Sequence, residues 1–139
     1  MRADVLNRTF TVLMVDDDKD DIYTVRRGIQ SSRSRIAFFA VSCAEELFAR
    51  LVDSSKTLPD VLVLDINIPR MNGFEILEQL KSHDVWAQIP VMVFSTSSHT
   101  ADRIRAKDLG AMSFATKFSS MKDLENWVSD LDDFLQSQI

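Results

Sequence analysis

The sequence predicts an α/β fold, a doubly wound parallel sheet of five strands with five helices on its two faces. Five short apolar runs are continuous rather than alternating, as expected for strands buried on both faces of a parallel sheet. Segments with helical periodicity separate these runs, so strand and helix patterns alternate along the chain. The expected strands are Thr11 to Val15, Ile36 to Val41, Val61 to Leu64, Val91 to Phe94 and Ser113 to Thr116.

The first two expected helices each follow a strand and begin with a capping signal. Asp18 is the expected N-cap of the first, and Asp20 and Asp21 are expected as solvated charges in its first turn, where they oppose the helix dipole favourably. Its apolar residues recur at spacings of three and four: Ile22, Val25 and Ile29. The second helix lies in "SCAEELFARL", where Ser42 and Glu45 have the spacing of a capping box.

The last three expected helices are marked by apolar periodicity and by their ends. Asn72 opens the third, whose apolar residues are Phe74, Leu77 and Leu80. The fourth contains Ile104 and Leu109 and stops at Gly110, a typical C-terminal cap. The fifth begins after Ser120, and its apolar residues step by three and four: Met121, Leu124, Val128, Leu131 and Leu135.

Length and composition indicate an ordinary globular protein. With 139 residues, the sequence is expected to form a single domain over residues 1–139, with a core from about residue 11 to residue 136. A net charge of -5 argues against the capture of nucleic acid or anionic lipid. The sequence has neither an apolar run long enough to span a membrane nor a secretory signal peptide, so we expect a cytoplasmic protein without membrane contact. Its single cysteine, Cys43, excludes an intramolecular disulfide and favours a core thiol.

Polar side chains follow four of the five expected strands. Asp16 and Asp17 follow the first strand, Asp65 the third, Ser95 the fourth and Lys117 the fifth. Because the carboxyl ends of parallel strands meet at one edge of a sheet, we expect these groups to converge there.

Three converging carboxylates point to a bound cation. Neighbouring carboxylates raise one another's pKa unless a positive charge offsets them. Mg²⁺ prefers oxygen ligands and is often held by a few carboxylates together with a phosphate oxygen. A carboxylate such as Asp65 can accept a phosphoryl group as an aspartyl phosphate, and an ammonium such as Lys117 can offset charge on the transferring oxygens. The sequence therefore predicts a site for Mg²⁺ and a phosphoryl group.

Four motifs, in their order and separation, resemble the receiver domain of bacterial response regulators of the chemotaxis type. They are "VLMVDDD", "VLVLDINIPRMNG", "IPVMVFSTSS" and "GAMSFATK". The resemblance runs from about Val12 to Leu135, nearly the whole sequence. It implies the flavodoxin-like receiver fold, with strands in the order 2-1-3-4-5.

The resemblance also implies roles for the residues at the sheet edge. Asp65 resembles the phosphoacceptor, and Asp16 and Asp17 resemble the acidic pair that holds Mg²⁺. Asp65 and the backbone carbonyl of Asn67 are the implied further metal ligands. Lys117 resembles the lysine that assists phosphoryl transfer.

The implied function is that of a stand-alone response regulator. A histidine kinase or phosphotransfer protein would donate the phosphoryl group, and slow hydrolysis would remove it, so the chain is expected to be a signalling protein rather than an enzyme. Ser95 resembles the switch hydroxyl and Phe114 the aromatic switch residue. Because the sequence ends at Ile139, just past the last helix, output is expected to pass through a downstream protein. The last two helices are a possible homodimer face.

The sequence departs from the family pattern at two positions. The family usually has a proline, in a cis peptide, after its lysine, whereas this sequence has Phe118 after Lys117. The sequence leaves open whether this peptide is cis or trans. Phe114 replaces the tyrosine of the chemotaxis regulator, so an output that needs a phenol hydroxyl is not expected.

Two other functions remain as alternatives. A phosphorylation-independent interaction module would keep the fold as a scaffold, and the Lys117-Phe118 departure is its support. A metal-dependent phosphatase of the haloacid-dehalogenase type would use Asp65 as its nucleophile, but the second carboxylate and the Gly-Thr of that class are missing.

Overall fold

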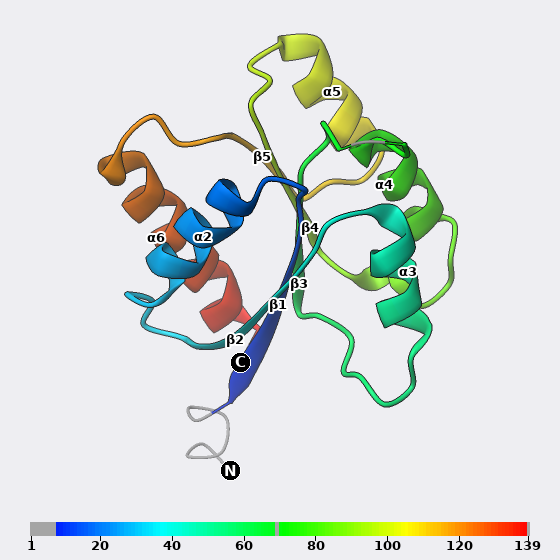
Figure 1. Cartoon of the computed structure of the whole chain (residues 1–139), viewed down its shortest axis with the longest axis horizontal. Helices are drawn as coiled ribbons and strands as arrows, with labels where there is room; N and C mark the ends of the chain where they lie inside the picture. Colours follow the sequence, from blue (N-terminus) through cyan, green and yellow to red (C-terminus); the bar gives the residue numbers. More distant parts are fainter. Residues whose placement is uncertain (1–7, 69, 139) are drawn as a thin grey trace.

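Five parallel strands form the sheet at the centre of the molecule, and their order is β2-β1-β3-β4-β5 (Figure 1). The computed structural model describes residues 8–68 and 70–138. The strands are β1 (Thr9–Val15), β2 (Arg35–Val41), β3 (Val61–Leu64), β4 (Val91–Ser95) and β5 (Ser113–Thr116). The predicted class, strand number and strand order are confirmed.

Helices cover both faces of this sheet. They are α2 (Lys19–Ile29), α3 (Ala44–Val52), α4 (Gly73–Lys81), α5 (Thr100–Asp108) and α6 (Met121–Ser137), with a 3₁₀ turn, η1 (Trp86–Gln88), before β4. Figure 1 shows α2 and α6 together on one side of the sheet and α3 and α4 on the other. Within residues 8–68 and 70–138, no helix combines the length and apolar character needed to cross a bilayer.

The alternation of side chains along the strands builds a separate core on each face. In β1, Leu13 and Val15 join the core under α3, α4 and α5, whereas Val12 and Met14 join the core under α2 and α6. Every residue of β3 and β4 is buried, which explains why their sequences are continuously apolar. Each buried Val or Leu side chain contributes about 1.5 to 3 kcal/mol, so the central strands are the most strongly held elements.

Three of the predicted N-caps are confirmed. Asp18 accepts from the backbone N–H of Asp20 at 2.9 Å. Asn72 accepts from the N–H of Glu75 at 3.0 Å, and Ser120 Oγ accepts from the N–H of Asp123 at 3.1 Å. Gly110 follows α5 with φ of 100°, the left-handed conformation expected of a C-terminal glycine.

The predicted capping box before α3 is wrong. Cys43, not Ser42, is the N-cap, and its side chain makes no capping hydrogen bond. Glu46 reaches back instead of Glu45, accepting from Ser42 N at 2.6 Å and Ser42 Oγ at 2.5 Å. Because the helix begins one residue later than predicted, the carboxylate four residues after Ser42 has the right reach. Cys43 is half-buried at this helix start, so the predicted core thiol is also wrong.

Two apolar residues that were predicted to mark buried helix faces are exposed. Ile104 is 56% exposed, and the core contact of α5 comes from Ala106. Met121 is 69% exposed because it lies in the first turn of α6, ahead of Leu124, where that helix enters the core.

Gly73 lets the start of α4 approach the loop after β3. Its N–H donates to Ile66 O at 3.0 Å. A Cβ at this position would lie 2.4 Å from Ile66 Cα and 2.7 Å from Asp65 O, both backbone atoms. Only a residue without a side chain therefore leaves room for the chain directly after β3 to follow this path.

We expect Gly73→Ala to lower the free energy of unfolding by about 1 to 3 kcal/mol, because the backbone of residues 65–66 has to move. Urea denaturation followed by circular dichroism measures this change. Gly28→Ala is the matched control, since a Cβ there would meet only the side chain of Leu124, at 2.8 Å, which can rotate away. An equal loss in both variants would contradict the backbone explanation.

Candidate functional site

Backbone hydrogen bonds continue past the strand ends and align the residues that follow. Asp65 N donates to Val15 O at 3.0 Å, so Asp65 lies beside Asp16. Lys117 N donates to Ser95 O at 2.7 Å, which ties the end of β5 to the end of β4. The predicted convergence of these groups at one edge of the sheet is therefore what the backbone geometry produces.

Three carboxylates form a compact cluster at this edge. Asp16, Asp17 and Asp65 each offer an oxygen, and these oxygens all lie within 4.8 Å of one another. Asp16 is 0% and Asp65 3% exposed, while Asp17 faces solvent. One oxygen of each buried carboxylate accepts a backbone N–H: Asp16 Oδ1 from Asp18 N and Asp65 Oδ1 from Asn67 N, both at 2.9 Å. Their Oδ2 atoms remain for other partners.

The ammonium of Lys117 lies among these oxygens. Its Nζ is 3.0 Å from Asp16 Oδ2 and 3.1 Å from Asp65 Oδ2. A third carboxylate, that of Asp21, forms an ion pair with the same ammonium. Asp21 was predicted to be a solvated charge, which is wrong, because α2 begins at Lys19 and turns Asp21 toward the end of β5.

Burial makes the metal-free cluster electrostatically costly. It raises the pKa of Asp16 to about 6, against the lowering effects of the Asp18 N–H and Lys117, and the neighbouring Asp65 carboxylate raises it further. Burial lowers the pKa of Lys117, but the hydrogen bonds that its ammonium donates to Asp21, Asp16 and Asp65 outweigh this effect and leave the pKa raised. A single ammonium thus faces more negative charge than it can neutralise.

The cluster fits a divalent metal ion. Asp16 Oδ2 is buried, and its partner among the described residues is the Lys117 ammonium, 3.0 Å away, which also pairs with Asp21 and Asp65. A buried carboxylate that shares a single ammonium with two other carboxylates is stabilised further when a second cation binds beside it. The exposed Asp17 gives such an ion a path from solvent, and an all-oxygen donor set suits Mg²⁺ or Mn²⁺.

Ser95 and Asn67 form a hydrogen-bonded pair beside the cluster. Ser95 is 0% exposed, and its Oγ accepts from Asn67 Nδ2 at 3.0 Å and from Ser97 N at 3.2 Å. Asn67 Nδ2 also lies 3.3 Å from Thr96 Oγ1. Sequence reasoning assigned a role only to the backbone carbonyl of Asn67 and missed its side chain. The signal for it was an amide two residues after a buried strand-end aspartate.

Phe114 lies in β5, away from the carboxylates and against α5. It is half-buried and packs against the core under α3, α4 and α5. The guanidinium of Arg103 lies 4.9 Å from its ring centroid, and Arg103 Nη1 donates to Phe114 O at 3.2 Å. The same guanidinium donates to Thr116 Oγ1 at 3.2 Å. Arg103 thus links α5 to β5, a contact that the sequence did not indicate.

The Lys117-Phe118 peptide is trans, since no cis peptide occurs in the described part of the chain. The Phe118 ring packs 4.6 Å from the Phe94 centroid and 5.8 Å from that of Trp127. Phe118 therefore turns into the core under α6 while Lys117 keeps its contact with Asp65.

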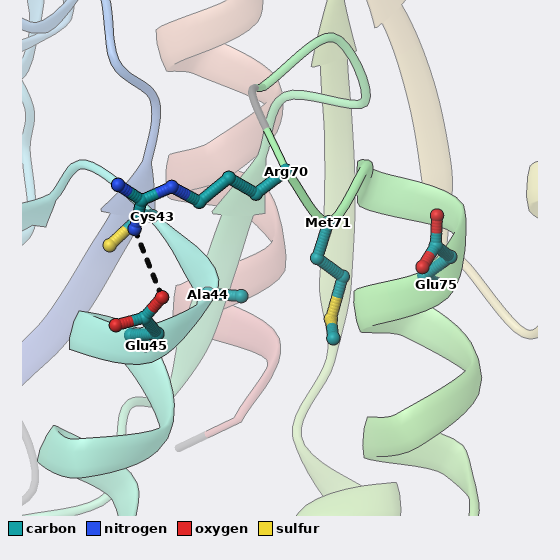
Figure 2. A pocket seen from close by; sticks show the side chains of 6 residues that line it. All are labelled: Cys43, Ala44, Glu45, Arg70, Met71 and Glu75. Carbon is teal, nitrogen blue, oxygen red and sulfur yellow. Dashed lines mark hydrogen bonds and ion pairs between the residues drawn. The ribbon is translucent and has the colours of Figure 1, made fainter.

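A pocket of about 270 Å³ lies close to the start of α3 and the loop after β3. Figure 2 shows the side chains that line it, which are those of Cys43, Ala44, Glu45, Arg70, Met71 and Glu75. None of these residues was predicted to belong to the site. Arg70 reaches across to Glu45 at 3.0 Å, with both side chains 77% exposed. Such an exposed pair contributes little to stability.

The sequence matches a known protein family over most of its length. Residues 12–129 match the response regulator receiver domain. The chain belongs to this family. Receiver domains act in two-component signalling, where they interact with histidine kinases or phosphotransfer proteins and with downstream targets, and they bind Mg²⁺ or Mn²⁺ at an acidic pocket.

Curated relatives of this receiver domain include longer and similarly sized regulators. The transcriptional regulatory protein PrrA of Mycobacterium leprae is 35% identical over 106 residues, which cover 76% of this chain and 42% of PrrA. The chain thus spans less than half the length of the PrrA proteins that it matches. Response regulator Rcp1 of Synechocystis sp. is 26% identical over 136 residues, covering 95% of this chain and 92% of Rcp1.

Solved structures of receiver proteins share the fold over nearly the whole chain. The phosphorylated cyanobacterial phytochrome response regulator RcpA has a TM-score of 0.84 at 27% identity, covering 95% of this chain and 97% of its own. The Mn²⁺-bound form of Rcp1 has a TM-score of 0.82 at 25% identity, covering 94% and 96%. These similarities confirm the predicted flavodoxin-like receiver fold.

The raised pKa of Asp16 leads to a prediction about stability without metal. Because the folded-state pKa of about 6 lies above the ordinary value of 3.8, stability from this group is full below about pH 4 and is lost as pH rises through 6. We therefore expect Asp16→Asn to stabilise the chelator-treated protein at pH 7.5 by about 1 to 3 kcal/mol, and by much less at pH 4.5. Urea denaturation at the two pH values measures the difference. Asp20→Asn, an exposed change of the same charge, should show no such pH dependence.

Proposed function

We propose that this receiver domain accepts a phosphoryl group on Asp65 from the phosphohistidine of a histidine kinase or phosphotransfer protein, in the presence of Mg²⁺. The observation that carries this proposal is the position of the Asp65 carboxylate. It is 3% exposed, lies in the cluster with Asp16 and Asp17, and is 3.1 Å from the Lys117 ammonium. A carboxylate with a cationic partner and a metal-binding neighbourhood is suited to phosphoryl transfer.

In the proposed reaction, an oxygen of Asp65 attacks the phosphorus of phosphohistidine. The new O–P bond forms as the P–N bond breaks, and the imidazole leaves with the electron pair and takes up a proton. Lys117 offsets negative charge on the transferring oxygens, and Asn67 N–H holds Asp65 Oδ1 at 2.9 Å so that the carboxylate stays oriented.

Asp16, Asp17, Asp65 and the backbone carbonyl of Asn67 would hold the metal ion. When bound, Mg²⁺ supplies further neutralisation of the phosphoryl oxygens. Water later cleaves the acyl phosphate slowly, so the chain acts as a signalling switch rather than as an enzyme with turnover.

The proposed switch uses Ser95 and Phe114. Ser95 Oγ already accepts two N–H donors, so its own hydroxyl proton is available to a phosphoryl oxygen on Asp65. Movement of Ser95 would free space along β4 and β5, let Phe114 change its packing, and shift a pre-existing equilibrium of the surface formed by α5, β5 and α6. This surface would contact the downstream protein or a second copy of the chain.

The match to response regulator Rcp1 over 92% of its length supports a proposed role as a response regulator, with residues 1–139 as one domain that acts in the cytoplasm through a protein partner. Lys117 contacts Asp65 although Phe118 follows it, which favours a phosphoacceptor over a phosphorylation-independent module. A phosphatase is disfavoured because the second carboxylate and the Gly-Thr of the haloacid-dehalogenase class are missing, and repeated turnover of a phosphate ester would distinguish it.

Phosphorylation at Asp65 can be tested directly. Incubation with acetyl phosphate and Mg²⁺ should add one phosphoryl group to the wild-type chain and none to Asp65→Asn, because the amide lacks the nucleophilic oxygen charge. Intact-protein mass spectrometry measures the addition, and circular dichroism checks that the variant is folded. Equal labelling of both proteins would sink the assignment.

Mg²⁺ should raise the melting temperature of the wild-type chain. At about 100 times its dissociation constant, a bound ligand adds about 2.7 kcal/mol of stability. The gain should be larger at pH 7.5 than at pH 5, because protons compete with the metal for Asp16, whose pKa is raised to about 6. Thermal unfolding with and without Mg²⁺ measures it.

Asp17→Ala should remove most of this gain in melting temperature, because it deletes one of the three carboxylates of the cluster. Asp17 is exposed, so its loss leaves the core intact. Asp20→Ala, which removes a charge from the adjacent helix start, should keep it. A full Mg²⁺ effect in Asp17→Ala would contradict the proposed metal ligands.

A further inference from the structure

Lys117 takes its three carboxylate partners from three different elements. Asp16 follows β1, Asp65 follows β3, and Asp21 lies in α2. Asp16 and Asp65 belong to the proposed metal cluster, but Asp21 lies outside it. The ammonium thus has two partners that a metal ion would share and one that it would not.

A divalent cation in the cluster changes the balance among these partners. It would draw on the charge of Asp16 and Asp65 and repel the ammonium, since like charges a few ångströms apart repel strongly in a partly buried site. The attraction of Lys117 to Asp21 does not depend on the metal. Asp21 is therefore the partner best placed to keep Nζ near Asp65 once the cation has bound.

The backbone of Lys117 is fixed by the sheet, so the position of its ammonium depends on the groups around the end of the side chain. Its backbone N–H is held by Ser95 O at 2.7 Å, and its Nζ lies 5.7 Å from the centroid of the Phe94 ring. Asp21 is well supported for this task, because α2 is capped by Asp18, which accepts from Asp20 N at 2.9 Å. A carboxylate on a capped helix provides a fixed point for the ammonium.

We propose that Asp21 is a positioning residue, which holds the Lys117 ammonium beside Asp65 while a divalent cation occupies the carboxylate cluster. The inference rests on the proposed phosphoacceptor function. Without the Asp21 charge, the Lys117 ammonium would be displaced from Asp65 when a cation is bound, and phosphoryl transfer to Asp65 would lose one of its two cationic groups.

The kinetic test compares Asp21→Asn with Asp20→Asn, an exposed residue in the same helical turn that undergoes the same charge change. Both variants and the wild type are phosphorylated with acetyl phosphate at saturating Mg²⁺. The rate constant should fall by about tenfold to a hundredfold in Asp21→Asn, since misplacing a reacting group by about 1 Å can cost about a hundredfold. It should stay within about twofold of wild type in Asp20→Asn.

A spectroscopic test follows Lys117 itself, without any phosphodonor. The side-chain NMR signal of Lys117, assigned with a Lys117→Arg variant, is recorded during a Mg²⁺ titration. Without Mg²⁺, the signal should report a paired ammonium in both wild type and Asp21→Asn, because Asp16 and Asp65 still hold it. With Mg²⁺, it should move to the position of a solvent-exposed lysine only in Asp21→Asn.

The outcomes separate this inference from the function on which it rests. A labelled wild type with an unchanged or faster Asp21→Asn overturns the positioning role alone, and a faster variant would indicate that Asp21 acts by repelling the anionic donor. The same Mg²⁺-induced signal shift in wild type and variant also overturns it. A wild type that accepts no phosphoryl group overturns both proposals.

Discussion

Backbone hydrogen bonds at the carboxyl ends of the parallel strands hold the acidic site together. The ladder continues from Val15 to Asp65 and from Ser95 to Lys117, so the residues after each strand inherit the register of the sheet. A slip of one residue in any of these strands would turn the following side chain to the other face. The apolar side chains of β3 and β4, buried on both faces, make such a slip costly. The packed core therefore holds the site residues in their positions.

The excess of negative charge at this edge is distributed rather than neutralised in one place. Asp18 accepts from N–H groups at the start of α2, Asp21 pairs with the ammonium of Lys117, and Asp20 is exposed to solvent. Asp16 is left with a buried oxygen whose partner, the Lys117 ammonium at 3.0 Å, is shared with Asp21 and Asp65. The carboxylates thus outnumber the ammonium between them, and this excess of negative charge favours a divalent ion, whose own positive charge would in turn attract a phosphoryl group.

Much of this could be predicted from the sequence because local signals coincide with burial. Continuous apolar runs located the strands, and the residues after them located the cluster that contains Asp16 and Asp65. The contact between Asp21 and Lys117 could not be found in this way, because it depends on how α2 is rotated against the end of β5, a property of tertiary packing. The choice of Glu46 over Glu45 depends similarly on the residue at which a helix starts. Periodicity shows which residues share a face, but it does not show where an element begins or what its charged face meets.

The packing of Phe118 between Phe94 and Trp127 gives the molecule an optical property. Trp127 lies in the core under α6 and contacts Phe118, the residue that follows Lys117, whereas Trp86 packs against Phe48 on the other face of the sheet. Of the two indoles in the chain, Trp127 is therefore the one that packs against the neighbour of Lys117, while Trp86 stacks on His83 on the far side of the sheet. A change at the acidic edge that moves Phe118 would therefore alter the fluorescence of Trp127 rather than that of Trp86.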